Sequence, residues 1–259
     1  MKKENMFNNF FVASPLEQFN IVSLLPISLP FGIDLSLTNS ALIEIISISL
    51  FIILLKLTVE KSTLVPTHWQ STIEMYYEFL LGLVKENLGK KGLVYFPFVF
   101  TLFSFIFTLN LIGMIPYDYA VTGQFVVAIG LSLSIWLFVT FTGFVRHGIN
   151  FLSMFFPQGA PLALAPLLVC IEFVSYSARA ISLGGRLSIN ITSGHTLLAI
   201  IGNFGWIMLN AGGLITLGAL IPVGLIFVLT FLELVVAIIQ AGVFTILTII
   251  YLNDAENLH

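Results

Sequence analysis

The chain has 259 residues, of which 58% are hydrophobic and 9% are charged, with a formal net charge of −3 and a mean hydropathy of +1.04. Soluble domains carry about 25% charged residues, so this composition excludes a soluble fold and indicates an integral membrane protein. The net charge is too small to indicate a nucleic-acid partner, and the single cysteine, Cys170, excludes an internal disulfide and a cysteine-based metal cluster.

Residues 1–36 are predicted to form a separate N-terminal segment, in which Pro15, Pro26 and Pro30 interrupt any long helix. The start has two lysines but no apolar core followed by a cleavage site, which argues against a secretory signal, while a short removable leader stays an open alternative. Residues 37–259 are predicted to form one membrane domain. Its hydrophobic residues come in long runs without two-residue alternation, which favours helices over a β-barrel.

The first span is predicted at residues 37–57, which are long enough to cross a bilayer once. Residues 66–88 differ, because charged residues alternate with apolar ones at helical spacing. The apolar positions are Trp69, Ile73, Tyr76, Tyr77, Leu80, Leu83 and Val84, and the charged ones are Glu74, Glu78, Lys85 and Glu86. This pattern predicts an amphipathic helix on the membrane surface, with a helix that only packs against its neighbours as the alternative.

Further spans are predicted at residues 93–115 and 120–145. Residues 162–201 and 204–252 are each much longer than the ~20 residues that cross a bilayer upright, and neither has a loop-like polar cluster at its middle. We therefore expect two long, strongly tilted helices joined as a hairpin near 202–205. The predicted fold is an all-α integral membrane protein of about six helices, one of them amphipathic.

The basic residues predict the orientation. Lys56, Lys61 and Lys85 follow the first span, as do Lys90 and Lys91. Arg146 follows the third span, and if the amphipathic helix does not cross, all six lie on one side. The positive-inside rule makes this the matrix or cytoplasmic side, so the N-terminus is outside and the C-terminus inside. Lys2 and Lys3 oppose this orientation.

Polar residues inside the long apolar run 162–201 form a pattern. Glu172, Arg179 and Arg186 are seven residues apart and share one stripe of a helix, which Asn190 extends. His195 lies on nearly the opposite face from Arg186. Charged groups within a membrane are expensive, so each of them is a functional candidate.

The last helix has a matching stripe, in which Glu233 and Gln240 are seven residues apart and Asp254 lies close by. The hairpin is therefore predicted to have two separate polar regions. One contains Glu172 and Asp254 toward the inside ends, and the other contains His195 and Glu233 toward the outside ends, with Arg186 between the two.

Structural roles are the alternatives for most of these groups. Arg179 could snorkel or pair with Glu172, His195 could be a core histidine, and Asp254 could be an ordinary interfacial carboxylate. His195 and Glu233 are too few to predict a metal site, and no cofactor motif is present. Arg186 is harder to explain in this way, because it lies too deep to snorkel comfortably.

The stretch 175–195, "SYSARAISLGGRLSINITSGH", resembles the signature helix of subunit a of the rotary ATP synthase. The resemblance covers nearly the whole chain, because five further stretches fit in order: "SPLEQF" at 14–19, "NLIGMIPY" at 110–117, "APLALAPLLVCIE" at 160–172, "ELVVAIIQAGVFTIL" at 233–247 and "IYLNDAENLH" at 250–259. The glycine–histidine pair at 194–195 resembles the residues found at this position in the mitochondrial branch of the family. Gly185, Ser188, Thr192 and Ser193 depart from the family's more apolar pattern, so we expect this part of the helix to be locally more polar and more flexible.

The resemblance implies a proton-channel subunit that is not an enzyme on its own. It implies that Arg186 faces a rotating ring of c subunits that carry a mid-membrane carboxylate, and that two half-channels reach this ring. Their implied residues are Glu172 and Asp254 on the matrix side, and His195, Glu233, Asn190 and Gln240 on the intermembrane-space side. Implied partners are the other membrane and peripheral-stalk subunits and lipids of the mitochondrial inner membrane, cardiolipin among them, with no nucleic acid.

Two other readings stay open. A secondary transporter would show broken helices in matching repeats, for which the pairs Gly184–Gly185 and Gly212–Gly213 are the only hint. A scaffold subunit of a respiratory complex would have no reason to keep Arg186 within the membrane.

Overall fold

A computed structural model of the chain describes residues 17–26, 28–29, 33–34, 36–60, 62–63, 65–115, 119–155 and 165–256. Several predictions fall outside these described residues: the leader at the start, Lys61, the beginning of the fourth apolar run at 162–164, and the end of the chain at His259.

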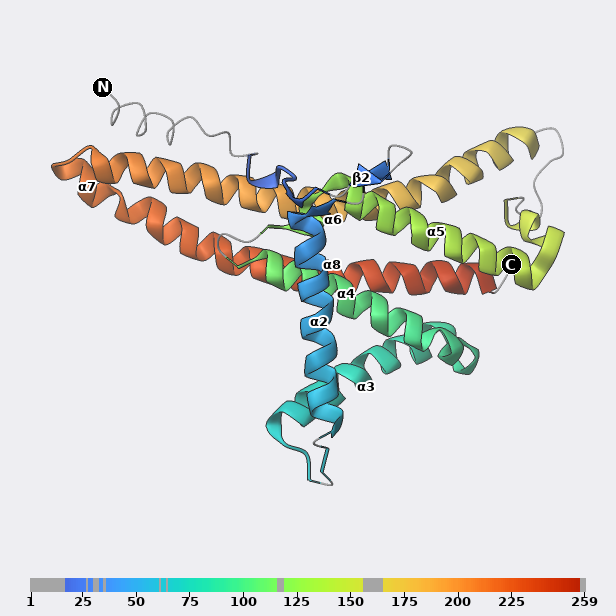
Figure 1. Cartoon of the computed structure of the whole chain (residues 1–259). Helices are drawn as coiled ribbons and strands as arrows, with labels where there is room; N and C mark the ends of the chain where they lie inside the picture. Colours follow the sequence, from blue (N-terminus) through green and yellow to red (C-terminus); the bar gives the residue numbers. More distant parts are fainter. Residues whose placement is uncertain are drawn as a thin grey trace.

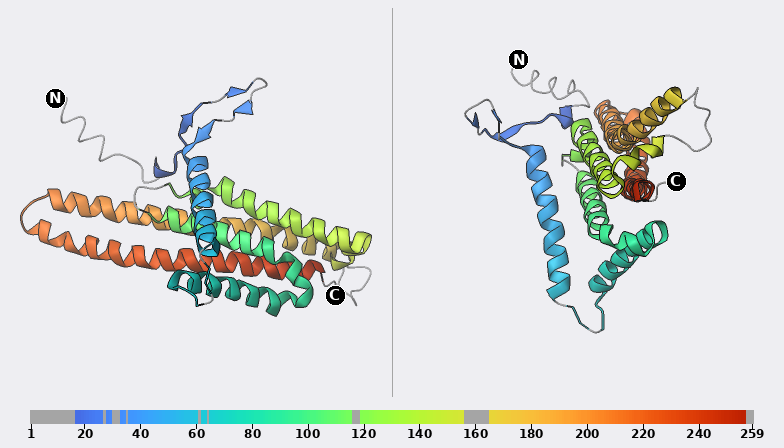
Figure 2. Two further views of the ribbon diagram at one scale, coloured as in Figure 1. Left: turned by 60° about the horizontal axis from the view of Figure 1, so that its bottom comes forward. Right: turned by 90° about the vertical axis from the view of Figure 1, so that its right-hand side faces the viewer.

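The N-terminal segment begins with the 3-10 turn η1 (Glu17–Phe19) and continues into two short antiparallel strand pairs. β1 (Ser23–Leu25) pairs with β4 (Leu37–Thr38), and β2 (Ser28–Leu29) pairs with β3 (Ile33–Asp34) in the register Ser28↔Asp34 and Leu29↔Ile33. This narrow ribbon projects from the start of the first long helix (Figure 2). The sequence predicted that no long helix forms here but did not predict the strands.

The helices follow in the order α2 (Asn39–Glu60), α3 (His68–Leu88), α4 (Phe96–Gly113), α5 (Phe125–His147), α6 (Ala165–Asn210), α7 (Leu214–Gly218) and α8 (Leu220–Glu256). Short 3-10 segments join some of them: η2 (Lys90–Tyr95), η3 (Val121–Gly123) and η4 (Gly148–Phe155). Within the described residues, five helices are long and apolar enough to cross a membrane, and α3 is not one of them. The predicted all-α membrane fold is confirmed.

The two longest helices, α6 and α8, have 46 and 37 residues. At 1.5 Å per residue they are about 70 and 55 Å long, against a hydrocarbon core of about 30 Å. They must therefore tilt strongly to stay within the bilayer. Figure 1 shows them side by side as an antiparallel hairpin, with α2 running across the hairpin rather than along it.

The turn of this hairpin lies later than the sequence predicted. Helix α6 continues through 202–205 to Asn210, and the chain turns at 211–213, where Gly212 and Gly213 have φ values of 73° and 64°. These left-handed values favour glycine and end the helix. Gly205 instead provides a close contact within the hairpin, because a Cβ there would lie 3.2 Å from Pro222.

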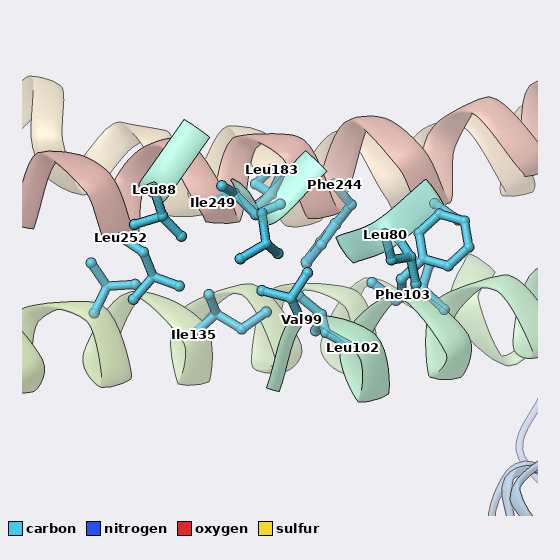
Figure 3. Close-up of a cluster of buried hydrophobic side chains, with 14 of the residues drawn as sticks. Leu80, Leu88, Val99, Leu102, Phe103, Ile135, Leu183, Phe244, Ile249 and Leu252 are labelled. Carbon is cyan, nitrogen blue, oxygen red and sulfur yellow. The ribbon is translucent and has the colours of Figure 1, made fainter. Parts of the chain in front are cut away.

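The core lies where α3, α4, α5, α6 and α8 meet, and Figure 3 shows its side chains interdigitating between these helices. Its fully buried members include Leu80, Val99, Leu187 and Phe244. Helix α3 contributes part of the apolar face predicted for it, since Leu80 and Val84 are buried. Trp69 was predicted to lie on the same face but is 77% exposed, so the prediction is wrong for the start of the helix. The structure therefore packs α3 along one face of the bundle, while its place at a membrane surface stays a prediction.

Gly184 brings α5 and α6 into close contact. A Cβ at this position would lie 2.5 Å from Ser132 Oγ and 2.7 Å from the Ala128 carbonyl oxygen, so only glycine fits without moving one helix. The helix is unbroken here, and Gly184 and Gly185 both lie inside α6. Gly184 is therefore a packing residue, and the unbroken helix at this pair gives no support to the broken helices of a transporter.

Candidate functional site

The polar residues of the hairpin form a series along one antiparallel helix pair. Helix α6 carries Glu172, Arg179, Arg186, Asn190 and His195, and α8 carries Glu233, Gln240 and Asp254. The cross-helix contacts occur in antiparallel order, so the series has two ends. We call the part that contains His195 and Glu233 the turn-side site, because it lies nearer the turn at 211–213. The part that contains Arg179, Asp254 and Glu256 is the terminal-side site.

The turn-side site brings together the two residues that the sequence placed in one polar region. His195 Nε2 lies 3.6 Å from Glu233 Oε1, and the exposed fractions of the two side chains are 17% and 6%. Gly194 makes this possible, because a Cβ there would lie 2.4 Å from the same carboxylate oxygen. The carboxylate therefore fits against α6 only at a residue that has no side chain.

A cavity of about 950 Å³ opens beside this pair. It is lined by side chains from several segments: Gln18, Asn39, Ile43, Met114, Ile115, Tyr119, His195, Leu198, Ala199, Gly202, Asn203, Ile226, Thr230 and Glu233. Both carboxylate oxygens of Glu233 and Nε2 of His195 are buried without a hydrogen-bond partner among the described residues. Buried polar atoms of this kind call for water, and a cavity lined partly by amides and hydroxyls has the room and the chemistry to hold it.

The series continues from the turn-side site toward the middle of the helices. Asn190 Nδ2 donates a hydrogen bond to Gln240 Oε1 at 3.1 Å. Asn190 lies between His195 and Arg186 on α6, so this contact is closer to Arg186 than the His195–Glu233 pair is. Asn110 of α4 contacts α8 close to Gln240, is 2% exposed and donates from Nδ2 to the carbonyl oxygen of Ala237 at 3.1 Å. The sequence analysis missed Asn110, although an amide inside the apolar run 93–115 was a signal for it.

Arg186 stands in the middle of the series, and its charge acts on Tyr251 of α8. Its side chain is exposed and makes no ion pair with any residue that the structure describes, and no neighbour lies within 4 Å of a Cβ built on Gly185. At 1.5 Å per residue it lies about 10 Å along the helix from Arg179 and about 14 Å from His195. Among the residues that the structure describes, Arg186 is thus an exposed cation of the hairpin that has no ion-pair partner and lies between the two polar sites.

The terminal-side site consists of ion pairs. Arg179 Nη1 lies 3.3 Å from Asp254 Oδ2, both side chains are about one-third exposed, and the guanidinium stands 5.7 Å from the ring centre of Tyr251. The suggested pairing of Arg179 with Glu172 is wrong for this structure, because α8 supplies a nearer carboxylate. Glu172 is half-buried on α6, and no described contact joins it to Asp254.

A second ion pair closes this end, and the sequence analysis did not predict it. Arg146 Nη1 at the end of α5 lies 2.6 Å from Oε1 of Glu256, whose side chain is 7% exposed. His147 Nε2 lies 3.0 Å from the carbonyl oxygen of Glu256, and Arg146 lies over the ring of Tyr95. These contacts tie the last turn of α8 to α5. The only signal for this ion pair in the sequence was the basic pair Arg146 and His147, directly after the predicted span 120–145.

Two of the polar departures in α6 have a clear role. Ser188 and Thr192 donate hydrogen bonds of 2.6 and 2.7 Å to the same acceptor, the carbonyl oxygen of Gly123 in η3. Rather than loosening α6, these hydroxyls tie its middle to the connection between α4 and α5. Within the described residues there is no group of three His, Cys, Asp or Glu side chains that would hold a metal ion.

Comparison of the sequence with known proteins identifies the family of the chain. The family of the ATP synthase A chain matches residues 41–253. ATP synthase subunit a of Chondrus crispus is 48% identical over 254 residues, which cover 98% of this chain and 100% of that protein. The subunit of Marchantia polymorpha is 48% identical over 250 residues (95% and 99%), and that of Rhodospirillum rubrum is 43% identical over 246 residues (95% and 99%). With a family match over most of its length and relatives of this similarity over nearly all of it, the chain belongs to the ATP synthase subunit a family.

Proposed function

We propose that this chain is the stationary proton-conducting subunit of an ATP synthase membrane sector, with two offset half-channels that meet at Arg186. It is not an enzyme on its own but a subunit of the complex that makes ATP. One observation carries the proposal: an exposed arginine, without an ion-pair partner among the described residues, stands between two polar sites at opposite ends of one antiparallel helix pair.

The turn-side site is proposed as the entry half-channel, open to the intermembrane space. The cavity of about 950 Å³ reaches His195 and Glu233, and Gln240 and Asn190 continue the polar path toward Arg186. Histidine and carboxylate groups exchange protons near neutral pH when their surroundings bring their pKa values into range. Asn190, Gln240 and Asn110 cannot titrate, so their role is to order water along the path.

The terminal-side site is proposed as the exit half-channel, open to the matrix, with Glu172 and Asp254 as its carboxylates. Asp254 is held by Arg179, and both side chains are about one-third exposed, so water reaches the pair. This assignment makes the matrix side the side of the chain's C-terminus and the intermembrane space the side of its N-terminus. It agrees with the position of Arg146 at the terminal end of the bundle.

Arginine suits the position between the half-channels. A ring carboxylate cannot enter hydrocarbon as an anion without a large cost, so it travels protonated through lipid and needs a cation where it is briefly ionised. The guanidinium has a pKa above 12 and keeps its own proton, whereas a buried lysine could lose one and become a relay. The same fixed charge repels protons and blocks a direct path between the half-channels.

The proposal implies the partners. The exposed face around Arg186 meets a ring of c subunits that carry a mid-membrane carboxylate, and the other exposed helix faces meet further membrane subunits, the peripheral stalk and inner-membrane lipids such as cardiolipin. Each proton that crosses under a potential of 100 mV releases about 2.3 kcal/mol, which drives the ring.

The half-channels are tested by neutralising one carboxylate at each end. Glu233→Gln should make proton-driven ATP synthesis depend more steeply on proton concentration in the intermembrane space, and Glu172→Gln should do so for matrix pH, since each slows a different transfer. Both should assemble, because each substitution preserves shape. Glu78→Gln, on the exposed face of α3, is the matched control. Unchanged rates and pH dependence in both variants would contradict the two-channel assignment.

A further inference from the structure

The N-terminal turn η1 lies against the turn-side site, although it belongs to none of the spanning helices. The ring of Phe19 meets the imidazole of His195 edge-on, with ring centres 6.3 Å apart and an interplanar angle of 85°. Phe19 also packs against the cluster formed by Ala120, Ile191 and Ala237. Figure 1 shows this N-terminal segment beside the middle of the hairpin.

The backbone of Phe19 is fixed by the connection between α4 and α5. Tyr119 donates from its hydroxyl to the carbonyl oxygen of Phe19 at 2.9 Å, and the side-chain amide of Gln124 donates to the same hydroxyl. Burial raises the pKa of Tyr119, and the Gln124 contact offsets part of this rise, so the phenol keeps the proton that it donates. The turn is thus anchored by a buried side chain rather than lying loosely on the surface.

Gly123 connects this anchor to the helix that carries His195. A Cβ at Gly123 would lie 3.0 Å from Cε1 of Phe19 and 3.3 Å from Oγ1 of Thr192. The α4–α5 connection therefore packs closely against both η1 and α6 at this glycine. The carbonyl oxygen of Gly123 accepts from both Ser188 and Thr192. Phe19 is therefore held at a fixed place relative to His195 by two independent sets of contacts.

The same turn forms part of the cavity wall. Gln18 and Tyr119 line the cavity of about 950 Å³ together with His195 and Glu233. On one side of the imidazole lies the Glu233 carboxylate, and edge-on to it lies the Phe19 ring. A histidine beside an open cavity can rotate about its side-chain bonds, and an aromatic edge contact restricts that rotation.

We infer that Phe19 is a positioning residue for His195. Phe19 keeps the imidazole directed at Glu233, so the N-terminal turn forms a part of the wall of the entry half-channel that affects proton transfer. The inference rests on the proposed function, because it assigns Phe19 to the proton path through His195. It gives the N-terminal segment a role in conduction rather than only in assembly.

The test is proton-driven ATP synthesis in vesicles that contain the whole complex, with each variant assembled to the wild-type level. Phe19→Leu keeps apolar volume but removes the ring and should slow synthesis about 3- to 10-fold, as expected for the loss of an aromatic contact. Phe19→Tyr keeps the ring edge and should restore most of the rate. Phe141→Leu, an exposed phenylalanine on α5, is the control and should leave the rate unchanged.

A double-variant cycle separates positioning from simple packing. His195→Ala should slow synthesis, and Phe19→Leu should add no further loss in that background, because its effect acts through His195. If the losses of the two single variants multiply in the double variant, the positioning role of Phe19 is wrong. It is also wrong if Phe19→Leu has a normal rate while His195→Ala is slow. Neither result contradicts the proposed entry path. A normal rate for His195→Ala would contradict the proposed entry path and the positioning role together.

If Phe19→Leu reduces assembly, Tyr119→Phe provides the second route. This substitution removes only the hydroxyl that anchors the Phe19 carbonyl and keeps the buried ring. A smaller loss of synthesis that disappears in the His195→Ala background would support the inference. Loss of equal size in both backgrounds would overturn it.

Discussion

The two ends of the α6–α8 hairpin hold their polar groups in different ways. At the turn side, His195 and Glu233 are buried, face a large cavity and leave three side-chain atoms without a hydrogen-bond partner among the described residues. At the terminal side, Arg179 and Arg146 pair with Asp254 and Glu256, and the arginines remain partly exposed. Both ends contain buried carboxylate oxygens without a hydrogen-bond partner among the described residues, including those of Glu256. The ends differ in what faces these carboxylates, which is a histidine and a large cavity at the turn side and fixed cations at the terminal side.

This difference predicts that small geometric changes matter more at the turn side. Gly194→Ala would place a Cβ 2.4 Å from the Glu233 carboxylate oxygen, so the carboxylate must move away from His195. A shift of about 1 Å in a reacting group can lower a rate by about 100-fold, and we expect a loss of ATP synthesis of that order. The measurement is synthesis by assembled complex in vesicles.

Gly224→Ala is the matched control for this prediction. It introduces the same methyl group on α8, at a glycine where nothing lies within 4 Å of the added Cβ. Its rate should equal that of the wild type. Full activity of Gly194→Ala would contradict the claim that the close approach of Glu233 to α6 matters for conduction.

At the terminal side the largest effect should be on stability. Arg146→Ala leaves the Glu256 carboxylate, which is 7% exposed, without its 2.6 Å partner. Removing one partner of a fully buried pair costs about 3 kcal/mol or more, and the cost here should be smaller because the guanidinium is 41% exposed. The last turn of α8 should still fray, and the thermal midpoint of the detergent-solubilised complex should fall. Adding Glu256→Gln to this variant removes the stranded charge and should recover part of the loss. A further fall in the double variant would contradict this explanation.

The smallest effect is expected at Arg179. Its pair with Asp254 is about one-third exposed on both sides, and such pairs contribute about 1 kcal/mol or less. Arg179→Ala should therefore lower ATP synthesis only by about 2- to 5-fold, and high salt should reduce the difference from wild type. The variant is compared with Lys56→Ala, which breaks the more exposed pair with Glu60 on α2. A loss as large as that of Gly194→Ala would erase the distinction between the two ends.

The residues that sequence could and could not predict differ in a physical way. Helical periodicity placed His195 and Glu233 in one polar region, because two long antiparallel helices leave few alternatives for stripes at matching depth. Periodicity gives the face of a residue but not its tertiary partner, so the sequence offers Glu172 on the same helix as an alternative partner for Arg179 and does not point to Asp254. Asn110 was missed for the same reason, since only the packing of α4 on α8 brings it to the site.

The turn position shows a second limit. Glycines at 202 and 205 and glycines at 212 and 213 look alike in sequence, yet only the second pair adopts positive φ. Gly205 is needed because Pro222 packs against it across the hairpin. Which glycine ends a helix and which allows close packing depends on the opposite helix, and a single apolar run contains no information about that contact.

The central claim is that Arg186 separates the two half-channels and draws the ring carboxylate into its ionised state. The most direct test measures ATP synthesis and passive proton flux together, in vesicles that contain equal amounts of assembled Arg186→Ala complex or of the Arg179→Ala control. We predict no proton-driven synthesis by Arg186→Ala with a passive flux that persists or rises, and coupled synthesis by Arg179→Ala. Robust synthesis by the Arg186→Ala complex would contradict the account.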